Sequence, residues 1–291
     1  MPALYLVSTP IGNLSDMTRR AVDTIRSSDV VFAEDTRRSA VLLRHYGIEA
    51  RLISAHEHNE AARAALVVEL LSEGKTVSMV SDAGTPLLSD PGARVVRSAL
   101  EAGYDVIPIP GPSALLAALV ASGLPADRFT FYGFLPRKGG ARDELLQEIA
   151  RSHHTAVIYE SPQRLEGLLQ DLAAAAGGER RVAVARELTK MHEEIVRLPL
   201  GEAVEAYTDR QVRGEIVLVV EGAPVKAAPQ QDDAGARAMA EALLAQGVPA
   251  SAVAKELRQR LGMNRNEAYD LAQELAGGSA RGWDGGEDGE L

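Results

Sequence analysis

The chain lacks cysteine altogether, although it has 291 residues. Without a thiol we expect no disulfide, no cysteine nucleophile and no thiolate metal site, and no other metal site is predicted. The sequence also has no apolar run of the roughly eighteen residues that a membrane span needs. Residues 1–8 lack the charged start of a signal peptide. We therefore expect a cytoplasmic protein without a membrane partner.

An excess of positive charge is also missing, because the formal net charge is -10. This argues against a generally basic surface that would hold nucleic acid without specificity. Basic residues nevertheless cluster locally, at Arg19-Arg20, Arg37-Arg38, Arg137-Lys138 with Arg142, and Arg180-Arg181. If nucleic acid is the substrate, we expect it on one face only. Solvated helix ends and loops are the alternative explanation for each cluster.

The common signatures of phosphate, dinucleotide, zinc and serine-hydrolase sites are absent as well. The sequence contains no G-x-G-x-x-G, no G-x-x-x-x-G-K-[ST], no H-E-x-x-H and no G-x-S-x-G. These absences argue against a hydrolase. Loops rich in Gly, Pro, Ser and Thr are better suited to a small zwitterionic or nucleoside-like ligand held by backbone groups.

Three such loops are present, and each follows an apolar run that predicts a buried strand. They cover residues 8–16, 81–92 and 108–113, after the runs 4–7, 77–80 and 106–107. In a parallel sheet with right-handed crossovers the three loops share the carboxyl edge, where ligands of open α/β sheets bind. An ordinary strand-to-helix turn is the alternative for any one of them.

Strands and helices alternate over residues 1–122, which predicts an N-terminal α/β domain with a parallel sheet covered on both faces. Residues 123–223 have shorter connections between the later strands, which predicts a C-terminal α/β domain with a mixed sheet. The predicted strands are 4–7, 30–33, 52–53, 77–80, 106–107, 129–134, 156–159, 182–185, 194–198 and 215–220. The predicted helices are 18–27, one ending at 46, 59–72, 91–102, 113–121, 143–152 and 164–176.

A predicted linker, 224–234, leads to three short amphipathic helices in residues 235–276. This helix-turn-helix-like module would expose basic side chains at Lys255, Arg258, Arg260 and Arg265. It is compatible with nucleic-acid binding, and a packing bundle or a dimer contact explains it equally well. Residues 277–291 are acidic and are predicted to be disordered.

Five motifs in order resemble those of the tetrapyrrole methylase superfamily, and within it the branch that acts on ribosomal RNA. They lie at 8–16, 34–37, 80–86, 108–113 and 186–190. The resemblance covers about residues 1–222. Relatives that methylate tetrapyrroles usually read Gly-Asp-Pro where this chain has Asp82-Ala-Gly-Thr-Pro86. That departure favours the ribosomal RNA branch.

The resemblance implies a two-domain tetrapyrrole-methylase-like fold, in a homodimer with S-adenosylmethionine bound between the domains. It also implies 2'-O-methylation of a cytidine in the decoding region of 16S rRNA, so that the small ribosomal subunit is a partner. Matching the motifs assigns the cofactor to one set of residues, which consists of Pro10, Ser81, Asp82, Ala83, Gly84, Ser113, Ala114, Tyr132 and Ser161.

Transfer to a ribose hydroxyl requires a proton acceptor. The candidates are Asp35, His56, and Glu187 or Lys190. Each has a structural alternative: helix capping for Asp35, loop support for His56, and mutual pairing for the last two. Phosphate contacts are expected from basic residues at Arg37, Arg38, Arg258 and Arg265.

Two other functions would explain the same residues. A tetrapyrrole methyltransferase would use the same cofactor on a porphyrinoid, with no need for the paired arginines or for the helical module. A non-catalytic ribosome-binding factor would have lost the cofactor, against which the unbroken Ser81–Pro86 loop argues.

Overall fold

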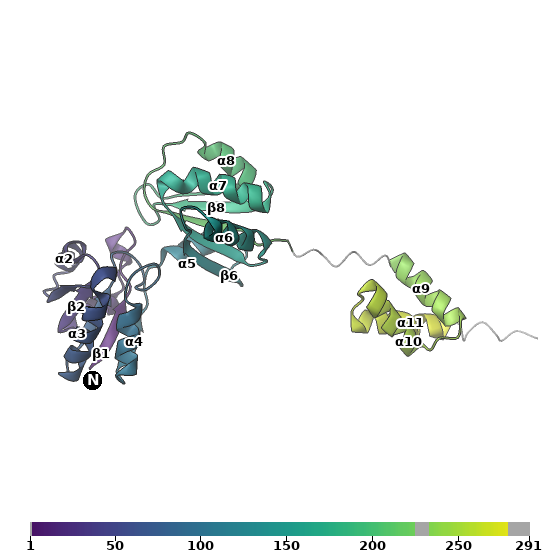
Figure 1. The fold of residues 1–291 in the computed structure, drawn as a ribbon, viewed down its shortest axis with the longest axis horizontal. Coiled ribbons are helices and arrows are strands. Elements are labelled where there is room, and N and C mark those ends of the chain that lie inside the picture. Colours follow the sequence, from purple (N-terminus) through teal and green to yellow (C-terminus); the bar gives the residue numbers. More distant parts are fainter. Residues whose placement is uncertain (1, 225–232, 279–291) are drawn as a thin grey trace, which may run out of the picture. The chain divides into compact units, whose positions relative to one another are not determined.

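The structure is a computed structural model that describes residues 2–224 and 233–278. The chain divides into two compact units, residues 1–223 and residues 224–291. The first unit contains two five-stranded sheets, and the second consists of three helices (Figure 1).

The first sheet is parallel throughout and has the strand order β3-β2-β4-β1-β5. Its strands are β1 (Ala3–Val7), β2 (Val30–Ala33), β3 (Leu52–Ser54), β4 (Val77–Val80) and β5 (Asp105–Ile109). The central strands are almost entirely apolar because helices cover both faces of the sheet, and the polar residue of β4, Ser78, is buried. Alternate residues of β2 show this directly: Val30 and Phe32 pack on one face, and Val31 and Ala33 on the other.

Each face of this sheet is covered by two long helices. Helices α1 (Arg19–Ser27) and α2 (Thr36–His45) pack on one face. Helices α3 (Glu60–Ser72) and α4 (Ala93–Glu101) pack on the other. A helix starting at residue 91 was predicted, but α4 begins at Ala93, because its capping residue Gly92 has a φ of 130°, outside the helical range.

The second sheet is mixed, with the order β6-β7-β10-β8-β9. Its strands are β6 (Phe129–Phe134), β7 (Thr155–Glu160), β8 (Arg181–Arg186), β9 (Glu194–Pro199) and β10 (Ile216–Val220). Strands β6 and β7 are parallel, and the remaining pairs are antiparallel. The predicted α/β fold class, with one parallel and one mixed sheet, is therefore confirmed.

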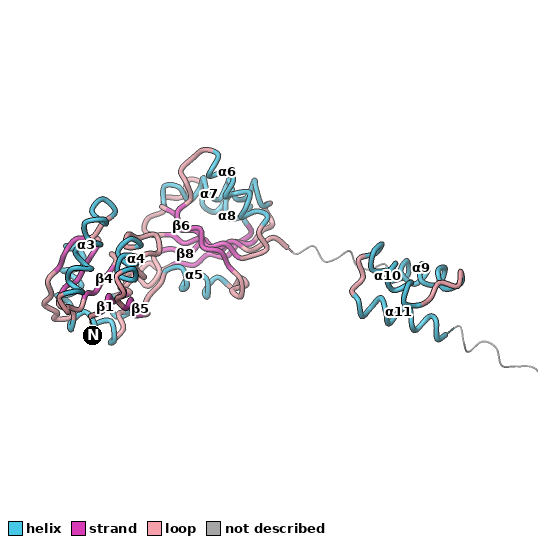
Figure 2. The backbone as a smooth tube through the Cα atoms, turned by 60° about the horizontal axis from the view of Figure 1, so that its bottom comes forward, coloured by secondary structure: helices cyan, strands magenta, loops and turns pink. Residues whose placement is uncertain are grey.

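Helices cover both faces of the second sheet as well, as Figure 2 shows. On one face lie α6 (Gly140–Arg151), α7 (Pro162–Ala176) and α8 (Leu200–Tyr207). On the other face lies α5 (Ala114–Ser122), whose Leu115 and Leu119 contact the core there. The division of the first unit at residue 122 stays a prediction.

Helix α8 was missed from the sequence. It is only eight residues long and carries Gly201 in its first turn, which lowers its intrinsic helix propensity. Three apolar side chains on one face, Leu200, Ala203 and Tyr207, are nevertheless buried against the core. Burial of this face therefore stabilises a helix that its composition does not signal.

The second unit consists of α9 (Asp233–Ala245), α10 (Ala250–Leu261) and α11 (Arg265–Gly278). Small and medium apolar side chains form its core, among them Val253, Leu257 and Ala268. The Asn264 side chain caps α11 by accepting hydrogen bonds from two backbone N–H groups. Of the predicted linker and acidic tail, residues 225–232 and 279–291 lie outside the described part of the chain.

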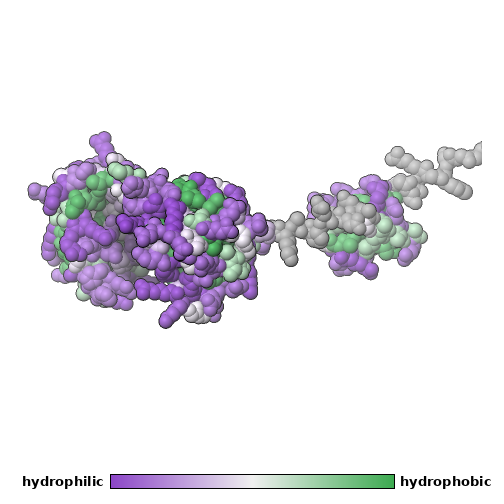
Figure 3. Space-filling model, turned by 90° about the horizontal axis from the view of Figure 1, so that it is seen from above, coloured by the Kyte–Doolittle hydropathy of each residue, from purple (hydrophilic) through white to green (hydrophobic). Residues whose placement is uncertain are grey.

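The visible surface is mostly hydrophilic, with smaller hydrophobic areas (Figure 3). None of the described helices is long and apolar enough to cross a membrane. Within residues 2–224 and 233–278, no three His, Asp or Glu side chains form a group that could hold a metal ion.

Candidate functional site

The loops after β1, β4 and β5 meet at the carboxyl edge of the first sheet. Because β1 lies between β4 and β5, its loop touches both neighbours. Thr9 and Gly84 exchange two backbone hydrogen bonds of 2.8 and 3.0 Å, and Ser8 N donates to Ile109 O. Thr85 Oγ1 lies 3.0 Å from Ser8 Oγ and donates to Pro112 O at 3.3 Å. These bonds fix the three loops against one another.

A cavity of ≈ 420 Å³ opens beside these loops and is closed on its other side by the second sheet. Its walls come from the carboxyl ends of β2 and β4, the start of α5, and the ends of β6, β7 and β10. The lining residues include Ile11, Glu34, Arg38, Asp82, Ala83, Gly84, Leu88, Asp90, Ser113, Ala114, Phe134, Tyr159, Ser161 and Glu215. We refer to this cavity as the cleft pocket.

The segment between β4 and α4 has an unusual backbone. Four of its residues, Gly84, Leu87, Ser89 and Gly92, have φ values of 84°, 73°, 69° and 130°. A positive φ is strained for leucine and serine, and such strain persists only where surrounding contacts impose it. Here the contact is with Glu60, whose Oε1 atom accepts hydrogen bonds from the backbone N–H of Gly92 at 3.0 Å and from that of Arg94, in α4, at 2.8 Å.

On the side of the first sheet, three carboxylates in the segments after β2 and β4 line the cleft pocket: Glu34, Asp82 and Asp90. Asp82 is paired, because its Oδ1 accepts from Asp35 N at 3.0 Å and its Oδ2 lies 3.2 Å from Arg38 Nη1. Burial, followed by the charge of Asp82, raises the pKa of Glu34. Burial, with a further contribution from Glu34, raises the pKa of Asp90 to about 6.

The second sheet contributes an aromatic wall. The Tyr159 ring lies edge-to-face against Phe131 and Phe134, with centroid distances of 4.9 and 5.6 Å. Phe134 is 57% exposed although it lines the pocket. The Ser113 Oγ atom also borders the pocket; it is buried and has no hydrogen-bond partner in the part of the chain that the structure describes. A pocket that offers both an unpaired polar atom and an aromatic wall suits an amphipathic ligand.

The structure brings together most of the residues predicted to bind the cofactor. Asp82, Ala83, Gly84, Ser113, Ala114 and Ser161 all line the cleft pocket. Ser81 is not among the lining residues; it is buried and donates a hydrogen bond to Gly84 O. Pro10 is not among the lining residues, although its neighbour Ile11 is.

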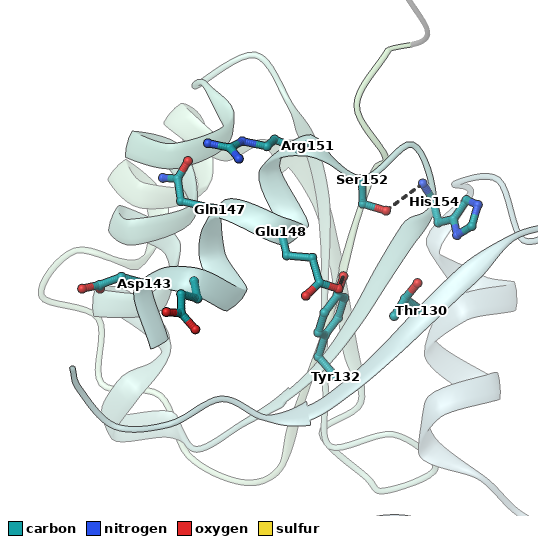
Figure 4. A pocket seen from close by; sticks show the side chains of 9 residues that line it. Thr130, Tyr132, Asp143, Gln147, Glu148, Arg151, Ser152 and His154 are labelled. Carbon is teal, nitrogen blue, oxygen red and sulfur yellow. Dashed lines mark hydrogen bonds between the residues drawn. The ribbon is translucent and has the colours of Figure 1, made fainter. Parts of the chain in front are cut away.

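Tyr132 is placed elsewhere. It lines a separate, open cavity of ≈ 780 Å³ between β6 and α6, where its hydroxyl donates to Glu148 Oε1 at 3.0 Å (Figure 4). Burial and this hydrogen bond raise the pKa of Tyr132 to about 12. The backbone of β6 shifts register between Phe131 and Gly133, so that Tyr132 does not pair with β7.

The predicted proton acceptors do not line the cleft pocket. Asp35 caps α2 and accepts two bonds from the Arg37 side chain, at 3.0 and 2.7 Å, which hold the pKa of Asp35 well below its usual range. His56 precedes the 3-10 helix 57–59 and contacts Asn59.

Glu187 and Lys190 pair with each other at 2.8 Å, and this hydrogen bond lowers the pKa of Glu187.

The predicted phosphate contacts lie on both units. The side chains of Arg37 and Arg38 are 90% and 70% exposed at the start of α2, and Arg38 also lines the cleft pocket. Arg258 and Arg265 are exposed on α10 and α11.

The residues of the cleft pocket that were not predicted as site residues include Glu34, Asp90, Phe134 and Tyr159. The sequence points to two of them as possible site residues, because Glu34 stands in one of the family motifs and Asp90 lies in a turn cluster next to another motif. Phe134 and Tyr159 end predicted strands, and the sequence alone does not say that these strands face the first sheet.

Known proteins resemble this chain in family, in sequence and in structure. A family model described as "Tetrapyrrole (Corrin/Porphyrin) Methylases" matches residues 3–204. A protein from Synechocystis sp. is 44% identical over 275 residues, covering 94% of this chain and 99% of its own. One from Mesorhizobium japonicum is 45% identical over 286 residues, covering 98% and 96%. Both are named "Ribosomal RNA small subunit methyltransferase I".

Solved structures share the fold at lower sequence identity. The methyltransferase CobJ has a TM-score of 0.59 and 19% identity, covering 77% of this chain and 95% of its own. Uroporphyrin-III C-methyl transferase from Thermus thermophilus, complexed with S-adenyl homocysteine, has a TM-score of 0.54 and 21% identity, covering 75% and 97%.

Proposed function

Since this chain belongs to the tetrapyrrole methylase family, and within it to the ribosomal RNA small subunit methyltransferase I proteins, we propose that it methylates 16S rRNA. The proposed acceptor is the 2'-oxygen of a cytidine ribose in the decoding region, and the methyl donor is S-adenosylmethionine. The observation that carries the proposal is the convergence of the β1, β4 and β5 loops on one pocket that the second sheet closes.

The residues of the cleft pocket fit S-adenosylmethionine. A volume of ≈ 420 Å³ is in the range of pockets for small ligands. The buried, unpaired Ser113 Oγ atom can form a hydrogen bond with a polar group of the cofactor. The Phe134 and Tyr159 rings offer an apolar wall for its adenine. Negative charge on Asp82 suits a sulfonium cation. The donor supplies a methyl group that the sulfonium charge makes electrophilic.

The chain's own contribution is alignment, exclusion of water and acceptance of a proton. The hydrogen bonds among the three loops keep the pocket preformed. Cofactor binding therefore loses little free energy to ordering of these loops. Asp35 and Glu187 are poor proton acceptors, because cationic partners stabilise their ionised forms.

RNA would approach over the start of α2. There Arg37 and Arg38 are mostly exposed, and a guanidinium can grip a phosphate with two parallel hydrogen bonds. We assign Arg258 and Arg265 of the helical unit to further phosphate contacts. We also infer a homodimer in the cytoplasm, where the small ribosomal subunit is found.

The test is mass spectrometry of 16S rRNA fragments after incubation with purified full-length protein and labelled S-adenosylmethionine. Free 16S rRNA and assembled small subunits serve as separate substrates. Label on the ribose of a decoding-region cytidine is expected in at least one of them. Unlabelled RNA, together with a shift in visible absorbance on adding a porphyrinoid, would favour a tetrapyrrole substrate instead. Absence of thermal stabilisation by the cofactor would favour a non-catalytic factor.

A further inference from the structure

Two carboxyls of the cleft pocket are not used by any ion pair. Glu34 follows β2, and Asp90 lies in the strained segment after β4. Since β2 and β4 are neighbours in the sheet, both carboxyls reach the same side of the pocket. Within residues 2–224 and 233–278, neither has a lysine, arginine or histidine nitrogen within 4.0 Å, whereas Asp35 and Asp82 each pair with an arginine.

The backbone around Asp90 is held in place. Ser89 has a φ of 69°, and a Cβ on Gly133 of β6 would lie only 3.2 Å from the Ser89 Oγ atom. On the other side, Gly92 N is anchored by Glu60, and Gly92 leaves room for Met79 beneath it. A carboxyl carried on such a segment is preorganised, because the neighbouring residues have little freedom to move.

We propose that Asp90 is the proton acceptor of the methyl transfer and that Glu34 sets its basicity, an inference that rests on the function proposed above. The ribose oxygen forms its bond to the methyl carbon as the carbon–sulfur bond breaks, with that electron pair staying on sulfur. The hydroxyl proton passes to a carboxylate oxygen of Asp90, and the products are a methyl ether and a neutral thioether.

The surroundings of Asp90 favour this role. Its pKa of about 6 results first from burial, then from the negative charge of Glu34, and in smaller part from that of Asp82. The charged groups around this pair are Asp82, Asp35 and Arg38, and Tyr159 faces Asp90 from the second sheet. At neutral pH Asp90 is mostly ionised, and it is a stronger base than an exposed aspartate.

The main test compares wild-type protein with Asp90→Asn under single-turnover conditions, using assembled small subunits and saturating cofactor. The rate of methyl transfer should fall by about 100-fold or more, while the cofactor dissociation constant from calorimetry stays within about threefold of wild type. Asp90→Glu keeps a carboxyl and should retain part of the rate, which separates loss of the base from misfolding.

The pH dependence gives a second comparison. Wild-type rates should decline below an apparent pKa near 6. In Glu34→Gln this decline should move to lower pH, because a neighbouring negative charge is removed. Asp82→Asn is the matched comparison, because it alters a paired carboxyl of the same pocket. It should weaken cofactor binding and move the decline less than Glu34→Gln does, since Asp82 contributes less than Glu34 to the raised pKa of Asp90.

A readout without turnover completes the test. In cofactor-free protein labelled at aspartate carboxyl carbons, NMR should show the Asp90 resonance titrating near pH 6, and at lower pH in Glu34→Gln. If wild type methylates subunits and Asp90→Asn does so within about fivefold, Asp90 is not the acceptor. Loss of cofactor affinity with an unchanged saturated rate would make Asp90 a binding residue and overturn the proposal. Wild type that methylates no RNA would instead refute the proposed function and this inference with it.

Discussion

Removing the Asp90 charge should stabilise the protein above pH 6, and the structure gives the size of the effect. The pKa of Asp90 is raised from 3.8 to about 6 in the folded state. A carboxyl with a raised pKa contributes stability that is fully present below pH 3.8 and is lost as the pH rises through 6. A shift of about two pKa units corresponds to about 3 kcal/mol.

Solvent screening reduces this figure, because Asp90 is only half-buried, and we expect about 1 to 1.5 kcal/mol. Asp90→Asn should therefore match wild type near pH 4 and exceed its free energy of unfolding by that amount at pH 8. In a unit of this size the midpoint of thermal unfolding would rise by about 2 to 6 °C.

Urea unfolding followed by circular dichroism between pH 4 and pH 8 measures the difference directly. Glu101→Gln, a change at an exposed carboxylate at the end of α4, is the control and should follow wild type at every pH. The free energy of unfolding is plotted against pH for wild type and for Asp90→Asn. If the two curves stay parallel over the whole range, burial does not penalise the Asp90 charge. The electrostatic part of the proton-acceptor proposal would then fail.

Four further outcomes are expected. Phe134→Ala should weaken cofactor binding about tenfold in calorimetry with little loss of stability, because the ring is 57% exposed. Gly84→Leu should abolish measurable binding, since φ is 84° there and a side chain would meet the β1 loop. Gly214→Ala should lower the free energy of unfolding by about 1 to 3 kcal/mol, because φ is 93° and the new Cβ would overlap the Glu187 carboxyl. Removing residues 224–291 should leave cofactor affinity unchanged and slow the methylation of assembled subunits; a full rate would exclude an RNA role for the helices.

The first sheet could be predicted from the sequence because its strands are short apolar runs that end at Gly, Pro, Ser or Asp. The run from Val77 to Val80 is one example, and β4 has the same limits in the structure. Helix boundaries were predicted less exactly. At α4 the preceding Pro91 suggested a helix start, but the positive φ of Gly92 delays it by two residues.

The candidate site was only partly predictable, because the order of the strands within the sheet cannot be read from the sequence. Motif matching assigned the loops after β1, β4 and β5, which lie side by side in the sheet. Nothing in the sequence shows that β2 lies next to β4, and this neighbourhood is what brings Glu34 to Asp90. Tyr132 shows the opposite case: it stands in a strand whose end reaches the pocket, but it lies at the irregular pairing in β6 and lines the cavity beside α6 instead.

The last motif, residues 186–190, contains two of the predicted proton acceptors, and its contacts favour a positioning role. Lys190 bridges Glu187 and Glu215 at 2.8 and 3.1 Å, and Glu187 Oε1 also accepts from Glu215 N.

The same turn touches the β1 loop of the first sheet. Thr189 Oγ1 accepts from Asn13 N at 3.1 Å, and a Cβ on Gly12 would overlap the Lys190 side chain. Because Ile11 and Glu215 both line the cleft pocket, this contact fixes a wall from the second sheet against a loop from the first. These contacts therefore favour a role for the motif in holding the two sides of the pocket together, which alignment of two reactants requires.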